Sequence, residues 1–233
     1  MDVQSLLNYF FRKIGCITVL VLVVWVVLLT TVWAQEKNAE NTKTSVRVAV
    51  ISFQPLTAGE GQENTVICPI SGIGYSCGKI LKGAENIVEE VFVDKLHELK
   101  GVELVPSDKV QDVYKRIASE SLKQSILKVF KKVGEELGTD FLAVGYVYRY
   151  TERVGYEYGS EHPASVAFEI HLIRIADGKV IWRGFFDKTQ KSLMEDVFQI
   201  SSFLKGGGKW LTASQLTKQG MDKVFETFPK LEQ

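Results

Sequence analysis

Two cysteines in a glycine-rich segment are the residues of this chain whose types and spacing most directly suggest chemistry. The segment VICPISGIGYSCGKI, residues 66–80, holds Cys68 and Cys77 nine positions apart, three glycines and a Gly-Lys pair. Glycine backbone amides can bind a phosphate, thiolates can bind a metal ion, and two thiols can form a disulfide. The neighbouring residues and the cellular compartment distinguish these three uses.

The glycine spacing argues against a nucleotide-binding phosphate loop. That loop requires a glycine, four residues, and then Gly-Lys followed by Ser or Thr. Five residues separate Gly72 from Gly78, three separate Gly74 from Gly78, and Ile80 stands where the hydroxyl is needed. A second glycine run, LKGGGKW at residues 204–210, departs from the pattern as well. We therefore predict no nucleotide and no other cofactor.

The histidines give no metal or catalytic pattern. His97, His162 and His171 are the three histidines, and none has the short spacing to another His or Cys that zinc modules show. His97 is predicted on the polar side of a helix, and His171 on the outward face of a strand, toward solvent or a cross-strand pair. A Ser, His and carboxylate set cannot be identified from the spacing either. The sequence therefore predicts neither catalytic nor metal-binding residues.

The N-terminal residues indicate export. A basic pair, Arg12 and Lys13, precedes a long apolar run within residues 14–34. About 18 apolar residues at about 1.5 Å each cover roughly 27 Å, close to the thickness of a hydrocarbon layer. Two interpretations remain open: a signal peptide cleaved after Ala34, or a single transmembrane anchor that would be the chain's contact with the membrane. In both, the rest of the chain is periplasmic.

Export changes the prediction for the two cysteines. Cys68 and Cys77 are then an even pair of thiols in an oxidising compartment, which favours a disulfide. Closing a loop of this length would stabilise the fold by roughly 2.7 kcal/mol. We therefore predict a Cys68–Cys77 disulfide that shapes the long segment 54–82 into a loop presented to a partner.

The remaining chain has the length and composition of one soluble domain. Over all 233 residues, hydrophobic side chains make up 45% and the formal net charge is zero, and residues 1–34 hold few of the charges, so the remaining part has no electrostatic footprint for nucleic acid. Residues 35–45 carry no large apolar side chain and are predicted to be a flexible linker. Residues 46–230 are predicted to form a single domain.

Hydrophobic periodicity predicts the fold class. The strand VRVAVISF, residues 46–53, is apolar on both faces, as expected for an interior strand. Thr212 and Gln215 form a capping-box pattern at the start of the last helix. The predicted order is β-α-β-α-α-β-β-β-α, an α/β (α+β) fold with one mixed sheet and helices packed on it. The remaining elements are predicted as helices at 84–101, 107–117 and 125–138 and as strands at 102–106, 140–150, 164–175 and 180–186.

Tyrosines and one charged strand are the candidate contacts for a partner. Three tyrosines at alternate positions line one strand face, and tyrosine combines contact area with a polar tip. In the last strand, Trp182 and Phe186 are predicted to point inward and their charged neighbours outward. The candidate partner-binding residues are Tyr75, Tyr146, Tyr148, Tyr150, Tyr156, Arg183 and Asp187.

Four stretches carry a resemblance to a known domain. They are VRVAVISFQP, AENIVEEVFVDKLHELKGVELVPSDKV, GEELGTDFLAVGYVYRY and FEIHLIRIADGKVIWRGFFD. They resemble the α/β domain shared by the curli secretion protein CsgG, the penicillin-binding-protein activator LpoB and the N-terminal part of TolB. The resemblance covers about residues 46–190. It implies work in the cell envelope without catalysis, and ring-forming relatives imply a homo-oligomer. The chain departs from lipoprotein relatives because Cys16 precedes its apolar run.

These observations predict a non-enzymatic bacterial cell-envelope accessory protein that binds other envelope proteins, in assembly, secretion or wall synthesis. One alternative is a wall-modifying hydrolase that uses carboxylates such as Asp187 and Glu169. Another is a structural, ring-forming oligomer. The segments 63–80 and 151–165 lack the long alternating pattern of a membrane-spanning hairpin, so we expect no pore.

Overall fold

The computed structural model describes residues 45–59, 64–156, 159–190 and 210–231. The chain divides after Thr44 into two units, and all the described residues belong to the second. The predicted signal or anchor at 1–34 and nearly all of the predicted linker at 35–45 therefore lie outside the described residues. Within the described ranges, no helix combines the length and the apolar character needed to cross a membrane.

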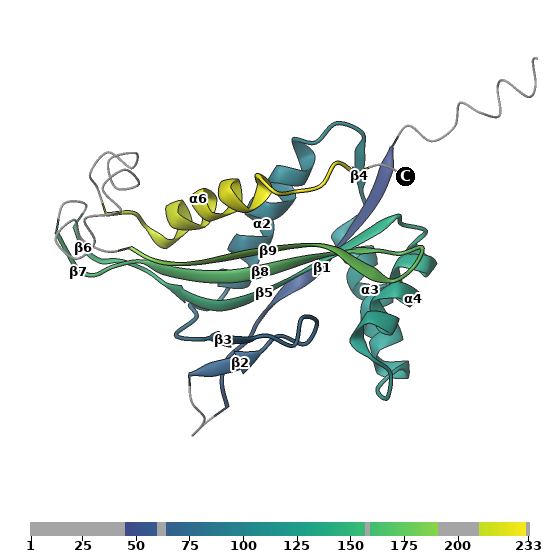
Figure 1. Ribbon diagram of the computed structural model, residues 1–233, viewed down its shortest axis with the longest axis horizontal. Helices are drawn as coiled ribbons and strands as arrows, with labels where there is room; N and C mark the ends of the chain where they lie inside the picture. The colour runs from purple at the N-terminus through teal and green to yellow at the C-terminus, as the bar shows by residue number, and fades with distance from the viewer. Residues whose placement is uncertain (1–44, 60–63, 157–158, 191–209, 232–233) are drawn as a thin grey trace, which may run out of the picture. The chain divides into compact units, whose positions relative to one another are not determined.

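A five-stranded mixed sheet forms the centre of the domain, as predicted (Figure 1). The first strand pairs in parallel with two neighbours, and the last three strands pair antiparallel. The predicted order of elements is confirmed once two short hairpins are set aside. In sheet order, the strands are β4 (Val102–Leu104), β1 (Val46–Pro55), β5 (Phe141–Thr151), β8 (Ser165–Arg174) and β9 (Lys179–Thr189).

Four helices cover the two faces of this sheet. The apolar cluster on one face joins the sheet to α2 (Ala84–His97) and α6 (Ala213–Phe225). The cluster on the other face joins it to α3 (Ser107–Glu120) and α4 (Ile126–Leu137). The predicted capping box is present at the start of α6, where the Thr212 side chain accepts a hydrogen bond from the Gln215 backbone N–H.

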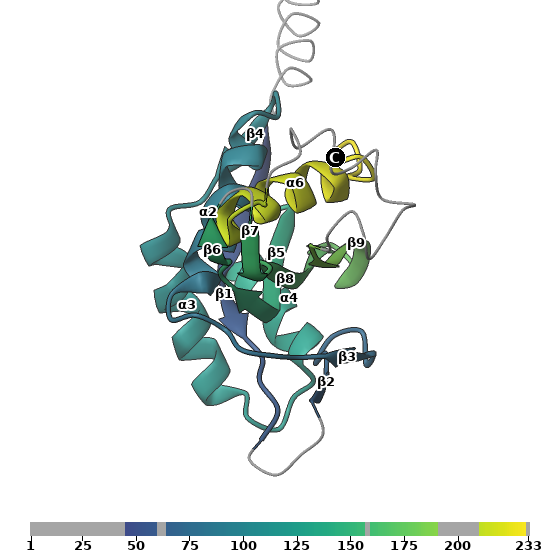
Figure 2. The ribbon, with the colours of Figure 1, turned by 90° about the vertical axis from the view of Figure 1, so that its left-hand side faces the viewer.

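Two short hairpins were not predicted from the sequence. One pairs β2 (Thr65–Ile67) with β3 (Gly74–Ser76), and the other pairs β6 (Val154–Tyr156) with β7 (Gly159–His162). Strands of three or four residues offer too few alternating positions to be recognised. The β2–β3 hairpin lies on the side of the sheet opposite α6, as Figures 1 and 2 both show. It therefore shares a face with α3 and α4.

Strand β8 alternates as predicted, but neither of its faces is open to solvent. Phe168 and Ile170 belong to the cluster under α2 and α6. The polar positions point the other way, toward the β2–β3 hairpin, and there Glu169 is 0% exposed and His171 is 1% exposed. His171 is therefore closed off from solvent, because the hairpin covers this part of the sheet. The other predicted surrounding, a cross-strand neighbour, is present, since Arg183 of β9 lies directly opposite.

The turn between β8 and β9 is stabilised by hydrogen bonds to the Asp177 side chain, which can be tested independently of the core. Arg174 Nη2 donates to Asp177 Oδ2 at 2.7 Å, and the Lys179 backbone N–H donates to Asp177 Oδ1 at 3.2 Å. The Arg174 hydrogen bond is the main cause that lowers the pKa of Asp177 to about 2. The stability it contributes is therefore present above the unfolded pKa, near 4, and is lost as the pH falls toward 2.

We expect Arg174→Ala to return the pKa of Asp177 toward its usual value, as followed by an NMR titration of the carboxyl carbon. Lys179→Ala is the matched control, because it keeps the backbone N–H that contacts Asp177 and should change the pKa much less. An Asp177 pKa that is the same in wild type and Arg174→Ala would contradict the assignment.

Candidate functional site

The β2–β3 hairpin has one face turned toward the sheet. Val66 pairs with Tyr75, and alternation places Cys68 and Cys77 on the same side as this pair. Tyr75 is 9% exposed, Cys77 7% and Cys68 1%, whereas the alternate residue Ile67 is 67% exposed. The hairpin therefore carries an inner face of two thiols and a tyrosine and an outer face open to solvent.

The register of the hairpin does not allow the predicted disulfide. The Cys68 backbone N–H donates to Ile73 O, and the Cys77 backbone N–H donates to Asn64 O. Cys77 thus lies opposite a residue four positions before Cys68, an offset of roughly 13 Å along the strands. A disulfide needs Cα atoms within about 7 Å. Both cysteines are free and buried, so the predicted bond is corrected to two separate thiols.

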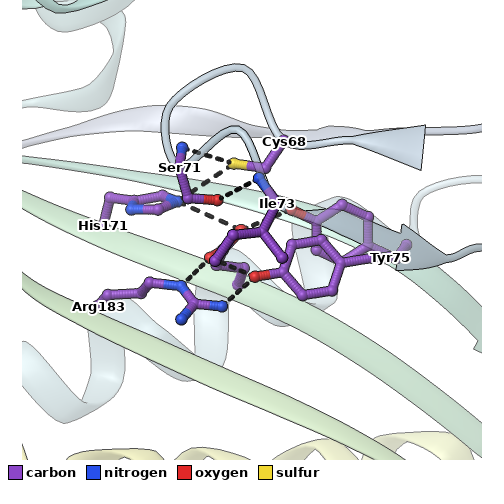
Figure 3. A network of polar contacts seen from close by, with 8 residues as sticks. Cys68, Ser71, Ile73, Tyr75, His171 and Arg183 are labelled. Atoms are coloured by element: carbon purple, nitrogen blue, oxygen red, sulfur yellow. Dashed lines mark hydrogen bonds and ion pairs between the residues drawn. The ribbon is translucent and has the colours of Figure 1, made fainter.

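Three neighbouring strands supply the polar side chains beneath the hairpin. β8 provides Glu169 and His171, β5 provides Tyr148, and β9 provides Arg183, which lies directly opposite His171 in the pairing register. In Figure 3, the labelled Cys68, His171, Tyr75 and Arg183 point toward one another between the hairpin and the sheet. The site is therefore assembled from segments about a hundred residues apart in the chain.

The Glu169 carboxylate is the centre of this network. Tyr75 OH donates to Oε1 at 3.0 Å, Arg183 Nε donates to the same oxygen, and Tyr148 OH donates to Oε2 at 2.7 Å. Burial alone would raise the pKa of Glu169, but hydrogen bonds from His171, Tyr148 and Arg183 outweigh it and hold the pKa well below its usual range. Glu169 is therefore a buried anion with its oxygens satisfied.

The Cys68 thiol belongs to the same network. Its Sγ lies 3.4 Å from His171 Nε2, and the Ser71 backbone N–H approaches Sγ at 3.5 Å. Burial would raise the pKa of Cys68, yet the hydrogen bonds with His171 and Ser71 leave it below the usual value. Burial would likewise lower the pKa of His171, but the contacts with Cys68 and Glu169 raise it. The pair is therefore inclined toward thiolate and imidazolium.

This arrangement differs from a catalytic triad. In a triad the histidine contacts the nucleophile through one ring nitrogen and the orienting carboxylate through the other. Here Cys68 Sγ and Glu169 Oε2 both lie 3.4 Å from Nε2 of His171, and the buried Nδ1 has no hydrogen-bond partner among the described residues. The three side chains are also at most 1% exposed, so the hairpin shields them from any substrate.

Aromatic contacts fasten the hairpin over this network. The Tyr75 ring stacks on Phe185 of β9 with centroids 4.7 Å apart and lies 4.6 Å from the ring of Tyr148. The Arg183 guanidinium lies 5.7 Å from the Tyr75 centroid and 5.6 Å from that of Phe185. Tyr75 therefore anchors the hairpin to the sheet through its ring and its hydroxyl.

The structure separates the predicted partner-binding residues into two groups. The prediction is corrected for Tyr75, Tyr146, Tyr148 and Tyr150, whose exposures of 9%, 2%, 0% and 2% leave almost no surface for a partner. The other three residues reach the surface. Tyr156 is 85% exposed on β6, Arg183 is partly exposed above Glu169, and Asp187 forms an ion pair with Arg149.

Sequence reasoning gave Glu169 only as a carboxylate of the hydrolase alternative and missed His171 as part of a site. Both residues alternate with apolar residues on β8, which predicts only that they lie on its outward face. A signal existed in the hairpin, where Val66 and Cys68, and then Tyr75 and Cys77, recur at a spacing of two. Two short runs with alternating apolar residues indicate a pair of strands whose apolar side must pack against another part of the protein.

Comparisons with known proteins give remote matches of structure alone. No protein-family model matches the chain, and no curated protein matches its sequence. The chain is similar to PelC from Paraburkholderia phytofirmans, a dodecamer, at 14% identity and a TM-score of 0.42, covering 78% of this chain and 86% of that one. It is similar to the LpoB C-terminal domain from Salmonella enterica at 13% identity and a TM-score of 0.38, covering 67% and 92%.

A third similar structure is the lipoprotein GNA1162 from Neisseria meningitidis, at 13% identity and a TM-score of 0.40, covering 70% of this chain and 98% of that one. LpoB, one of the proteins named in the sequence resemblance, thus recurs among the similar structures. Identities and TM-scores this low establish neither a family nor a function for the chain.

Proposed function

We propose that this chain is a non-enzymatic accessory protein of the bacterial cell envelope, and that it binds another envelope protein through the outer face of the β2–β3 hairpin. The observation that carries the proposal is the contrast between the two faces of this hairpin. Its inner face is fixed to the sheet by the Glu169 network, while Ile67 on its outer face is 67% exposed and Ile73, opposite Cys68, is 43% exposed. The hairpin is therefore held in place and presents two exposed isoleucine side chains.

Ile67 and Ile73 are the two large apolar side chains of the hairpin that are exposed, and we call them together the hairpin patch. Ile67 pairs with Gly74, and the hydrogen bond from the Cys68 N–H to Ile73 O brings Ile73 to the same end of the hairpin. Binding a partner orders exposed side chains and loops, which opposes association. Because Tyr75 already orders this hairpin, the entropic cost of ordering it on binding a partner is smaller.

Burial argues against the hydrolase alternative. Its two carboxylates were Glu169 and Asp187, and Glu169 is 0% exposed with both oxygens hydrogen-bonded. Asp187 is engaged by Arg149. The two-carboxylate mechanism needs both groups, and the buried Glu169 cannot reach a glycosidic bond, so a binding role accounts better for the network. The assignment to the envelope rests on the export pattern of residues 14–34 and on the sequence resemblance.

The test is partner capture from cross-linked envelopes, followed by affinity measurements with the captured protein. We expect the double variant Ile67→Ser with Ile73→Ser to bind that partner at least about tenfold more weakly, because exposed apolar anchors dominate such interfaces. Leu122→Ser is the matched control. Leu122 is an equally apolar side chain, 88% exposed, in the connection between α3 and α4.

Equal affinities for the wild type and the hairpin variant would refute the hairpin as the binding surface. If Leu122→Ser weakens partner binding as well, the binding is non-specific association through exposed apolar residues. A second copy of this chain as the captured protein would favour the ring-forming alternative over a different envelope protein.

A further inference from the structure

We propose that Cys68, His171 and Glu169 form a binding site for a divalent transition-metal ion of the Zn²⁺ class, located between the β2–β3 hairpin and the sheet. The site is distinct from the hairpin patch and does not depend on the proposed function. It was not expected from the sequence, because its ligands have no short spacing along the chain. The fold brings together one ligand from the hairpin and two from alternate positions of β8.

Two of the three pairs of ligand atoms already have the separations that such an ion requires. His171 Nε2 lies 3.4 Å from Cys68 Sγ and 3.4 Å from Glu169 Oε2, and one ligand atom from each of the three residues lies within 4.8 Å of the others. Tetrahedral zinc has bonds of about 2.3 Å to sulfur and about 2.0–2.2 Å to nitrogen and oxygen. Those bonds place neighbouring ligand atoms roughly 3.4–3.6 Å apart.

The donor types select the class of ion. A thiolate, an imidazole and a carboxylate together suit zinc and related transition metals, whereas calcium and magnesium prefer sets made of oxygen. Zinc bound by three side chains has a fourth position that a water can fill.

The surroundings match those of ligands held in place for a metal. Ligating carboxylates are usually oriented by hydrogen bonds from a second layer of residues. Here Arg183 Nε and Tyr75 OH donate to Oε1 of Glu169, and Tyr148 OH donates to Oε2, the oxygen that also faces His171 Nε2.

The orientation of the His171 ring gives a second, independent indication. Its Nδ1 is buried without a hydrogen-bond partner among the described residues, so contacts at Nε2 determine how the ring lies. A proton on Nε2 faces two acceptors at equal distances, Cys68 Sγ and Glu169 Oε2. A metal ion in the place of that proton would bind all three atoms at once.

The experiment uses the full chain, reduced, freed of metal and solubilised in detergent, with Co²⁺ as a spectroscopic probe for Zn²⁺. We expect one Co²⁺ per chain with a thiolate-to-cobalt charge-transfer absorption that added Zn²⁺ abolishes. Cys68→Ala should remove that absorption. Cys77→Ala and Cys16→Ala are matched controls and should retain it, because Cys77 shares the inner face of the hairpin but lies far from His171.

His171→Gln should weaken Co²⁺ binding at least tenfold, and an unchanged affinity would overturn the site. A wild-type chain without the charge-transfer absorption, or a Cys68→Ala chain that keeps it, would overturn it as well. A second measurement needs no variant: Zn²⁺ should slow alkylation of Cys68 at least tenfold in the wild type and leave Cys77 unaffected, as read by mass spectrometry. Equal effects on both cysteines would refute the proposal.

Discussion

Replacing Glu169 with alanine is expected to lower the free energy of unfolding by about 3–5 kcal/mol, because removing one partner of a buried ion pair leaves the other groups uncompensated. Glu169 is 0% exposed and accepts hydrogen bonds from Arg183, Tyr75 and Tyr148. Without the carboxylate, the guanidinium loses its counterion and the two hydroxyls lose their acceptor. Urea unfolding followed by circular dichroism measures the loss.

Asp187→Ala is the matched control for this prediction. It removes the carboxylate of another pair with an arginine of the same sheet, but Asp187 is 38% exposed and Arg149 17% exposed. Pairs open to solvent contribute little, so we expect a loss within about 1 kcal/mol. A loss for Glu169→Ala as small as that of the control would mean that the network does not hold the hairpin.

A double substitution separates the contribution of the Glu169–Arg183 ion pair to stability from that of side-chain packing. Glu169→Leu with Arg183→Met replaces the ion pair by apolar side chains of similar size, and such replacements are often neutral or stabilising. We expect the double variant to be more stable than Glu169→Ala. Tyr75 and Tyr148 would still lack an acceptor, so recovery to the wild-type value is not expected.

The arrangement of the sheet could be predicted because it depends on local patterns. Strand β1 is apolar at consecutive positions, which indicates burial on both faces whichever strands it pairs with. Thr212 and Gln215 lie within one helical turn, so their capping box can be read from four residues. Features of this kind need no knowledge of the rest of the chain.

The site could not be predicted in the same way, because its parts are far apart in sequence. Glu169 and His171 alternate with apolar residues on β8, and that pattern is the same whether water or a hairpin covers the polar side. The hairpin that decides between these outcomes has strands of three residues. The contact from Cys68 to His171 spans 103 positions, which periodicity cannot detect.

The disulfide prediction failed for a related reason. An even number of cysteines and an oxidising compartment indicate that a bond is chemically available, but not that the two Cα atoms are close. The backbone hydrogen bonds of the hairpin offset Cys68 from Cys77 by four residues and direct Cys68 to His171 instead. Composition therefore singled out Cys68 but paired it with Cys77 instead of His171.

The close packing of α6 on β9 leads to the second large effect. A Cβ atom on Gly184 of β9 would lie 2.2 Å from Cγ1 of Val224 and 2.5 Å from Cη2 of Trp182. A Cβ on Gly220 of α6 would lie 2.5 Å from the Phe186 ring. Each glycine thus faces a large side chain of the opposite element, and the helix approaches the strand more closely than larger residues would allow.

Gly184→Val is therefore expected to lower the free energy of unfolding by about 3 kcal/mol, the upper end of the usual range for overpacking. Val224 is β-branched and has little rotamer freedom to move away, so α6 has to shift from the sheet. Gly74→Val is the matched control. Its Cβ would meet only Thr65 Cγ2 at 3.5 Å, an ordinary contact, and valine favours a strand. We expect Gly74→Val to change stability by less than about 1 kcal/mol. Equal losses in urea unfolding would show that side-chain crowding between α6 and β9 is not what requires Gly184.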